Sequence, residues 1–101
     1  MAVERRAAVA VLHVSGEFDL CAVERVEAAL ARATGGPTER VVFDLRGVSF
    51  LDVPGLTTLL RADARAPFAV DVVPPPGPAS RIFALTEADH PLHLVADVGE
   101  A

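Results

Sequence analysis

The stretch "RVVFDLRGVSFLDVPGLTTLL", residues 40–60, decides the fold because two hydrophobic patterns meet inside it. Its beginning, "RVVFDL" (Arg40 to Leu45), has an apolar core without alternation, which is typical of a strand covered on both faces of a sheet. After the connection "RGVSF" and Asp52, leucines recur at helical spacing as far as Leu60. The sequence therefore predicts a buried strand, a short exposed junction and an amphipathic helix.

The junction contains residues that begin helices. Asp52 stands at the N-cap position, where a carboxylate accepts hydrogen bonds from free backbone N–H groups. Pro54 falls in the first turn, where a helix tolerates a missing N–H. Gly55 either permits close packing of the helix or belongs to a contact surface. Asp52 likewise can be a cap, a contact to a partner, or both.

Upstream of this stretch, the sequence predicts one more strand and one more helix. The strand is "AVAVLHV" over residues 8–14, and the turn residues Ser15-Gly16 follow it. Asp19 is the predicted N-cap of an amphipathic helix, which ends at "GGP" over residues 35–37. Cys21, early in this helix, is predicted to be a half-buried filler.

Downstream, the pattern continues with shorter elements. The predicted elements are a strand over 68–73, a stiff proline-rich connection over 74–78, a short helix from Ala79 to about Thr86 or Ala88, and a last strand over 92–96. Such alternation of strands and helices indicates an α/β sheet with helices packed on it.

Composition limits what the chain can be. Its 101 residues, 51% of them hydrophobic, fit a single domain over residues 1–101 with a core over about 8–98. The formal net charge of −5 opposes attraction to phosphate, so no nucleic-acid partner is expected. The single cysteine cannot form an intramolecular disulfide, and no apolar run approaches the roughly 18 residues that span a bilayer. We expect a cytoplasmic protein without membrane insertion.

The sequence favours neither catalysis nor a cofactor. No nucleophile stands at a recognisable spacing from a base, "DVPGL" is not a nucleophile elbow, and no glycine-rich phosphate loop occurs. The segment "ADHPLH" places Asp89, His90 and His93 close together, but a turn followed by a strand explains it better than a metal site. We therefore predict no enzyme activity, no metal and no cofactor.

Three blocks of the chain resemble the STAS domain, the sulfate transporter and anti-sigma factor antagonist family. They are "GEFD" (16–19), "VVFDLRGVSFLDVPGLTTLL" (41–60) and "SRIFALT" (80–86), and the similarity covers roughly residues 8–98. The resemblance implies a STAS fold: one mixed sheet of four to five strands, with three or so helices packed mainly on one side.

The resemblance also implies a function. Stand-alone members of this kind work by partner switching, in which the unphosphorylated protein binds an anti-sigma factor that is also a Ser/Thr kinase. Phosphorylation of a serine directly after the family's aspartate breaks the complex. By this similarity, the partner-binding residues are predicted to be Asp19, Asp52, Val53, Pro54, Gly55 and Leu56.

This chain departs from the pattern at the phosphorylated position. Val53 stands where the family has its acceptor serine, and it has no hydroxyl group to receive a phosphoryl group. Pro54 removes the neighbouring hydroxyl as well. Ser49, Thr57 and Thr58 are the remaining candidates for phosphorylation, although hydroxyls inside helices often bond back to the carbonyl four residues earlier.

Two functional hypotheses follow. The first is a regulatory binding protein that resembles an anti-sigma factor antagonist, with an anti-sigma factor kinase and other STAS proteins as its partners. The second is an accessory or scaffold subunit of a transport or multi-protein signalling complex, because the loop lacks its phosphorylation site.

Overall fold

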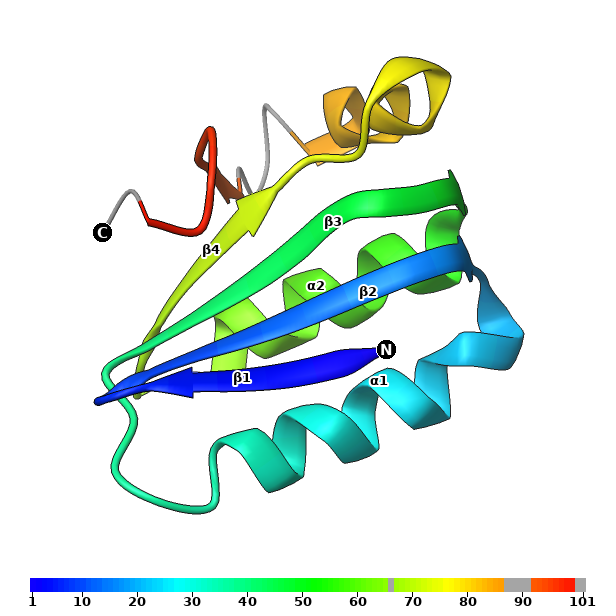
Figure 1. Cartoon of the computed structure of the whole chain (residues 1–101). Helices are drawn as coiled ribbons and strands as arrows, with labels where there is room; N and C mark the ends of the chain where they lie inside the picture. The colour runs from blue at the N-terminus through cyan, green and yellow to red at the C-terminus, as the bar shows by residue number, and fades with distance from the viewer. Residues whose placement is uncertain (66, 87–91, 100–101) are drawn as a thin grey trace.

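The computed structural model describes residues 1–65, 67–86 and 92–99 and shows a mixed five-stranded sheet in the order β1-β2-β3-β4-β5 (Figure 1). The elements are β1 (Ala2–Arg6), β2 (Val9–Phe18), α1 (Leu20–Ala33), β3 (Arg40–Leu51), α2 (Val53–Arg65), β4 (Ala69–Val73), the 3-10 helix η1 (Gly77–Thr86) and β5 (His93–Leu94). The predicted α/β fold is confirmed. Within the described ranges, no helix is long and apolar enough to cross a membrane.

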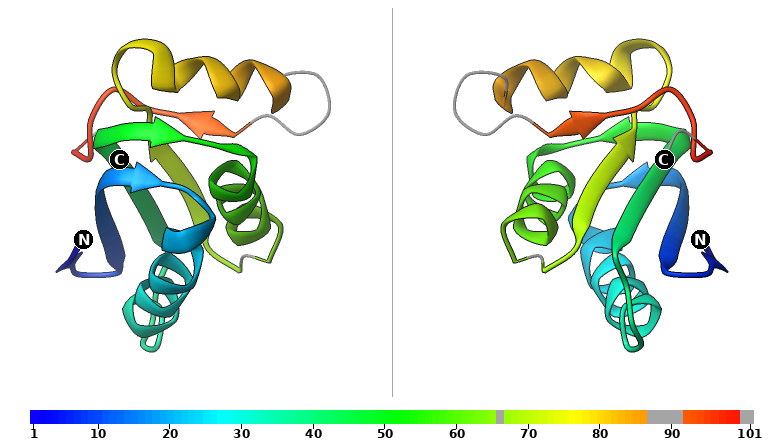
Figure 2. Two further views of the ribbon diagram at one scale, coloured as in Figure 1. Left: turned by 90° about the vertical axis from the view of Figure 1, so that its right-hand side faces the viewer. Right: turned by 90° about the vertical axis from the view of Figure 1, so that its left-hand side faces the viewer.

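The connections between strands explain why α1 and α2 share one face of the sheet. β2, β3, β4 and β5 are neighbours in chain order and pair in parallel, so every crossover steps in the same direction. Right-handed crossovers that step in one direction place their helices on the same face. Figure 2 shows α1 and α2 on this face. β1 instead forms an antiparallel hairpin with β2.

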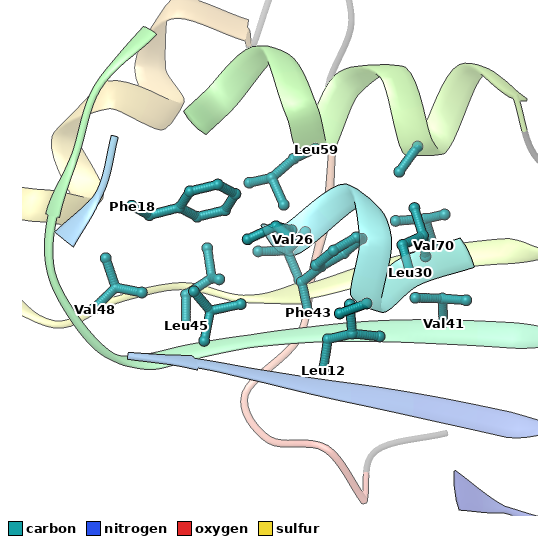
Figure 3. Packing of buried hydrophobic residues seen from close by; sticks show 14 of the residues in the cluster. Leu12, Phe18, Val26, Leu30, Val41, Phe43, Leu45, Val48, Leu59 and Val70 are labelled. Carbon is teal, nitrogen blue, oxygen red and sulfur yellow. The ribbon is translucent and has the colours of Figure 1, made fainter. Parts of the chain in front are cut away.

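The main core lies between the sheet and these helices (Figure 3). Phe18, Phe43 and Leu59 are fully buried there. Val42 belongs to a smaller cluster on the opposite face of the sheet, with Val11 and Val73. Because its neighbours Val41 and Phe43 are also 0% exposed, β3 is covered on both faces, as its unbroken apolar run predicts.

Several boundaries differ from those predicted. β1 was not predicted, because "AVERR" is short and its charges resemble a solvated terminus; such charges are common on edge strands. β3 includes the connection "RGVSF", because β2 also continues and pairs with it up to Phe18 and Leu51. The last strand is reduced to His93–Leu94.

The predicted short helix exists in a tighter form. η1 begins at Gly77, within the predicted proline-rich connection, and is a 3-10 helix. It contacts β3 and α2, and its Phe83 is buried in the main core. The alternative end at Ala88 lies outside the described residues.

A charged cluster ties β1, β2 and β3 together on the face opposite the helices. His13 lies between two carboxylates, with its Nδ1 2.7 Å from Asp44 Oδ2 and its Nε2 3.0 Å from Glu4 Oε1. Hydrogen bonds to Glu4 and then to Asp44 raise the pKa of His13. The side chain of Arg46 donates to Asp44 and is the main cause that lowers the pKa of Asp44 to about 2. A protonated His13 therefore bridges three strands.

We expect this bridge to make stability depend on pH. Because the folded-state pKa of His13 is raised, its contribution is fully present below the unfolded pKa of about 6.5 and is lost as pH rises through the folded value. Urea unfolding of wild type and His13→Gln at about pH 5.5 and about pH 9 measures the difference in unfolding free energy. The wild-type advantage should shrink at the higher pH, and an advantage that is equal at both values would contradict this account.

Candidate functional site

Two loops meet at one edge of the sheet. β2 ends at Phe18 and β3 ends at Leu51, and these two residues are paired in the parallel register. Asp19 and Asp52 follow directly, and each precedes a helix. We call the edge formed by residues 18–20 and 50–54 the Asp52 end. The structure therefore brings Asp19 and Asp52, both predicted to bind a partner, to the same edge of the sheet.

Asp52 caps α2 as predicted. Its Oδ1 accepts a hydrogen bond of 3.0 Å from the backbone N–H of Gly55, and its backbone carbonyl accepts one of 2.9 Å from Leu56. Pro54 is the second residue of α2. The N–H groups of the first turn have no partner within the helix, so the missing N–H of Pro54 costs no helical hydrogen bond. The start of α2 is therefore fixed by the local sequence.

The predicted cap at Asp19 is only half correct. Asp19 is the N-cap residue of α1, but its carboxylate makes no capping hydrogen bond. A capping side chain often accepts from the third residue of the helix. Here the backbone N–H of that residue, Ala22, donates to the carbonyl oxygen of Asp19 at 3.0 Å, so the donor is satisfied without the side chain.

Gly55 joins the two loops by a close approach of backbone to backbone. A Cβ at this position would overlap the carbonyl oxygen of Phe18 and lie 2.6 Å from Cδ1 of Leu51. Close packing, one of the two predicted roles of Gly55, is therefore present. Leu56 is 4% exposed and packs in the core, so it supports the surface from below and is not a contact on it.

Three large apolar side chains are exposed at the Asp52 end, where Asp19 and Asp52 are half-buried. Val53 is 58% exposed, and two residues that the sequence analysis did not single out, Leu20 and Phe50, are 70% and 48% exposed. Cys21, predicted to be half-buried, is exposed beside Leu20. A signal for Phe50 exists in the sequence, because adjacent residues of a strand point to opposite faces and Leu51 enters the core. Phe50 therefore points to the face of the sheet opposite the main core. Leu20 and Val53 line the same hollow, and exposed apolar side chains that lie together are typical of a binding surface.

A hollow opens between the first turns of the two helices. It has a volume of about 220 Å³, and Leu20, Val23, Val53, Thr57 and Arg61 are among the residues that line it. We call it the Val53 hollow. Val53 therefore lines a depression between the two helices.

The remaining hydroxyls differ in their access. Thr57 and Thr58 donate to the carbonyl oxygens of Val53 and Pro54 at 2.8 and 3.0 Å, which is the back-bonding expected in a helix. Thr58 is 1% exposed, so a kinase could reach it only after local unfolding. Ser49 is exposed. Of these predicted alternatives, Ser49 is the most accessible.

His93 is one of the three residues that the sequence analysis considered as a metal site, and the structure pairs it with an aspartate. Its Nδ1 pairs with Oδ1 of Asp71, which also pairs with Arg40. Burial would raise the pKa of Asp71, but hydrogen bonds from His93 and Arg40 outweigh it and the pKa is lowered. Asp89 and His90 lie outside the described residues.

Comparison with known proteins identifies the family. A family model described as "Mlab, STAS domain" matches residues 1–96, so the chain belongs to the STAS domain family. No curated protein matches the chain.

Solved structures show the same fold. An anti-sigma factor antagonist from Mycobacterium paratuberculosis is 29% identical, with a TM-score of 0.85 over 98% of this chain and 86% of that chain. SpoIIAA, an anti-sigma factor antagonist in its unphosphorylated form, is 19% identical with a TM-score of 0.70 over 98% and 90% of the two chains. A candidate antagonist from Thermotoga maritima is 15% identical with a TM-score of 0.79, over 98% and 88%.

We expect Gly55→Ala to destabilise the protein strongly. The new methyl group would meet backbone at Phe18, which cannot move aside, and overpacking of this kind costs roughly 1–3 kcal/mol or more. Gly35→Ala is the matched control, because its Cβ would lie 3.5 Å from its nearest neighbour, the carbonyl oxygen of Arg32. Urea unfolding measures both variants, and equal effects would show that the close approach is not needed.

The two aspartates should respond differently to substitution. Asp52→Ala removes a capping bond and should lower the unfolding free energy by about 1 kcal/mol, whereas Asp52→Asn keeps an acceptor and should change it by a few tenths at most. Asp19→Ala should change it by less than about 0.5 kcal/mol, because no capping bond is lost. Thermal unfolding of the three variants tests this order, and a larger loss at Asp19 would contradict it.

Proposed function

We propose that the protein is a cytoplasmic regulatory binding protein that docks on an anti-sigma factor of the Ser/Thr kinase type through the Asp52 end. The observation that carries the proposal is the pair of exposed apolar residues Leu20 and Val53, which line one hollow at the start of the two helices. By resemblance, the family has its phosphorylated loop at this place. The relative at 29% identity is itself an anti-sigma factor antagonist, which supports the same class of function.

The proposal includes a binding surface that phosphorylation at residue 53 cannot switch off. In relatives with a serine here, a phosphate of about −1.5 to −2 charge would lie at the positive end of the following helix and would alter the contact surface. Val53 is the first residue of α2, so it keeps this position but offers a methyl surface and no hydroxyl. Docking would therefore persist in the presence of ATP.

A second function is supported by a different observation. Val53 and Pro54, the first two residues of α2, have no hydroxyl group. Their presence favours an accessory or scaffold subunit of a transport or multi-protein signalling complex that uses the same surface without phosphorylation. A neighbouring gene for a sigma factor or kinase would favour the first function, and transporter genes would favour the second.

Calorimetry with a candidate anti-sigma factor kinase from the same organism tests the proposal. We expect wild type to bind in ADP and to stay bound in ATP, since Val53 has no hydroxyl. Val53→Ser should bind in ADP and be released in ATP, and Val53→Ala, the matched control, should behave like wild type. Binding by neither wild type nor Val53→Ser would overturn the first function and move support to the second.

A further inference from the structure

The two helices form a continuous seam with a hollow at each end. α1 and α2 both start at the Asp52 end of the sheet and contact each other along its face (Figure 2). The Val53 hollow lies between their first turns. A second hollow of about 220 Å³ lies between their last turns, with Leu30, Ala31, Ala62 and Phe68 among its lining residues. We call it the Phe68 hollow.

The spacing of the hollows matches the spacing of side chains on a helix. Along α2, the Val53 hollow is centred near Thr57 and the Phe68 hollow lies beside Arg65. At a rise of 1.5 Å per residue, this separation is about 12 Å. Residues i and i+7 or i+8 of a second helix are separated by the same distance and lie on one face of that helix.

The charges along the seam indicate which kind of residue the second helix needs between its two apolar side chains. Arg61 lines the Val53 hollow one turn before Arg65, is exposed, and has a guanidinium group without a partner in the described part of the chain. Arg65 is 3.8 Å from Glu27 across the seam, and its side chain is 64% exposed. An acidic side chain midway between two apolar ones would pair with Arg61.

We infer that the seam between α1 and α2 binds one amphipathic helix of a protein partner, with apolar residues at i and i+7 or i+8 in the two hollows and an acidic residue between them opposite Arg61. This inference rests on the proposed function for the identity of the partner, but it extends the contact surface beyond the Asp52 end to the last turns of both helices. It also assigns Arg61 and Ala31 to the binding surface.

A pair of designed peptides tests the seam without the natural partner. Each is a stapled helix of roughly 16 residues, because an unstapled helix of this length is marginal in water. One has leucines seven residues apart with a glutamate between them, and its control has the same composition with the leucines five residues apart. NMR titration should show shifts at both hollows with the first peptide, and binding at least tenfold weaker with the control. Equal affinities, or no shifts at either hollow, would overturn the inference.

Matched variants then test whether the peptide contacts Arg61 and Ala31. Arg61→Glu should weaken the first peptide about threefold to tenfold, and its control Arg25→Glu, an exposed site that lines neither hollow, should not. Ala31→Gln should fill the Phe68 hollow and weaken binding, whereas Ala28→Gln, also exposed but outside the hollows, should leave it unchanged. Losses equal to those of the controls would contradict the assignment.

The kinase experiment separates failure of this inference from failure of the proposed function. If the kinase binds wild type, Arg61→Glu and Ala31→Gln equally well, the proposed function stands and the seam is not the contact. If the kinase does not bind but the spaced peptide does, the seam is a helix-binding surface and the partner belongs to another class.

Discussion

The arrangement of the Asp52 end depends on the missing side chain at Gly55. Because no Cβ is present, the first turn of α2 lies directly against the carbonyl oxygen of Phe18, at the end of β2. This contact sets the distance between the loop that follows β2 and the loop that follows β3. Leu20 and Val53, the first residues of α1 and α2, line one hollow for this reason. A surface made of two loops is thus held by backbone packing and not by hydrogen bonds between the exposed residues.

The two faces of the sheet have different roles. One-directional crossovers gather the helices on one face, so the grooves between elements that could take a partner lie there. The opposite face carries the bridge between Glu4, His13 and Asp44, which holds the edge strand β1 to its neighbours. Deprotonation of His13 weakens the attachment of β1 on this face, which lies away from the surface that we propose for binding.

The sequence predicted the features that depend on local chemistry. Asp52 and Pro54 define the start of α2 because capping and a first-turn proline are properties of a few adjacent residues. It did not predict β1, whose pairing depends on the distant strand β2, nor the satisfaction of the Ala22 N–H by the backbone of Asp19. The exposure of Leu20 was also missed, because a leucine at the start of an amphipathic helix is expected to be buried until the neighbouring loop is placed.

The central claim is that residue 53 contacts a protein partner in the cell. Incorporating a photo-crosslinking amino acid at position 53, and separately at position 6 on the opposite face of the sheet, tests it most directly. The account predicts a crosslink from position 53 to a kinase-type anti-sigma factor, identified by mass spectrometry, and none from position 6. Crosslinks from position 6 alone would contradict it and would move the binding surface to the face without helices.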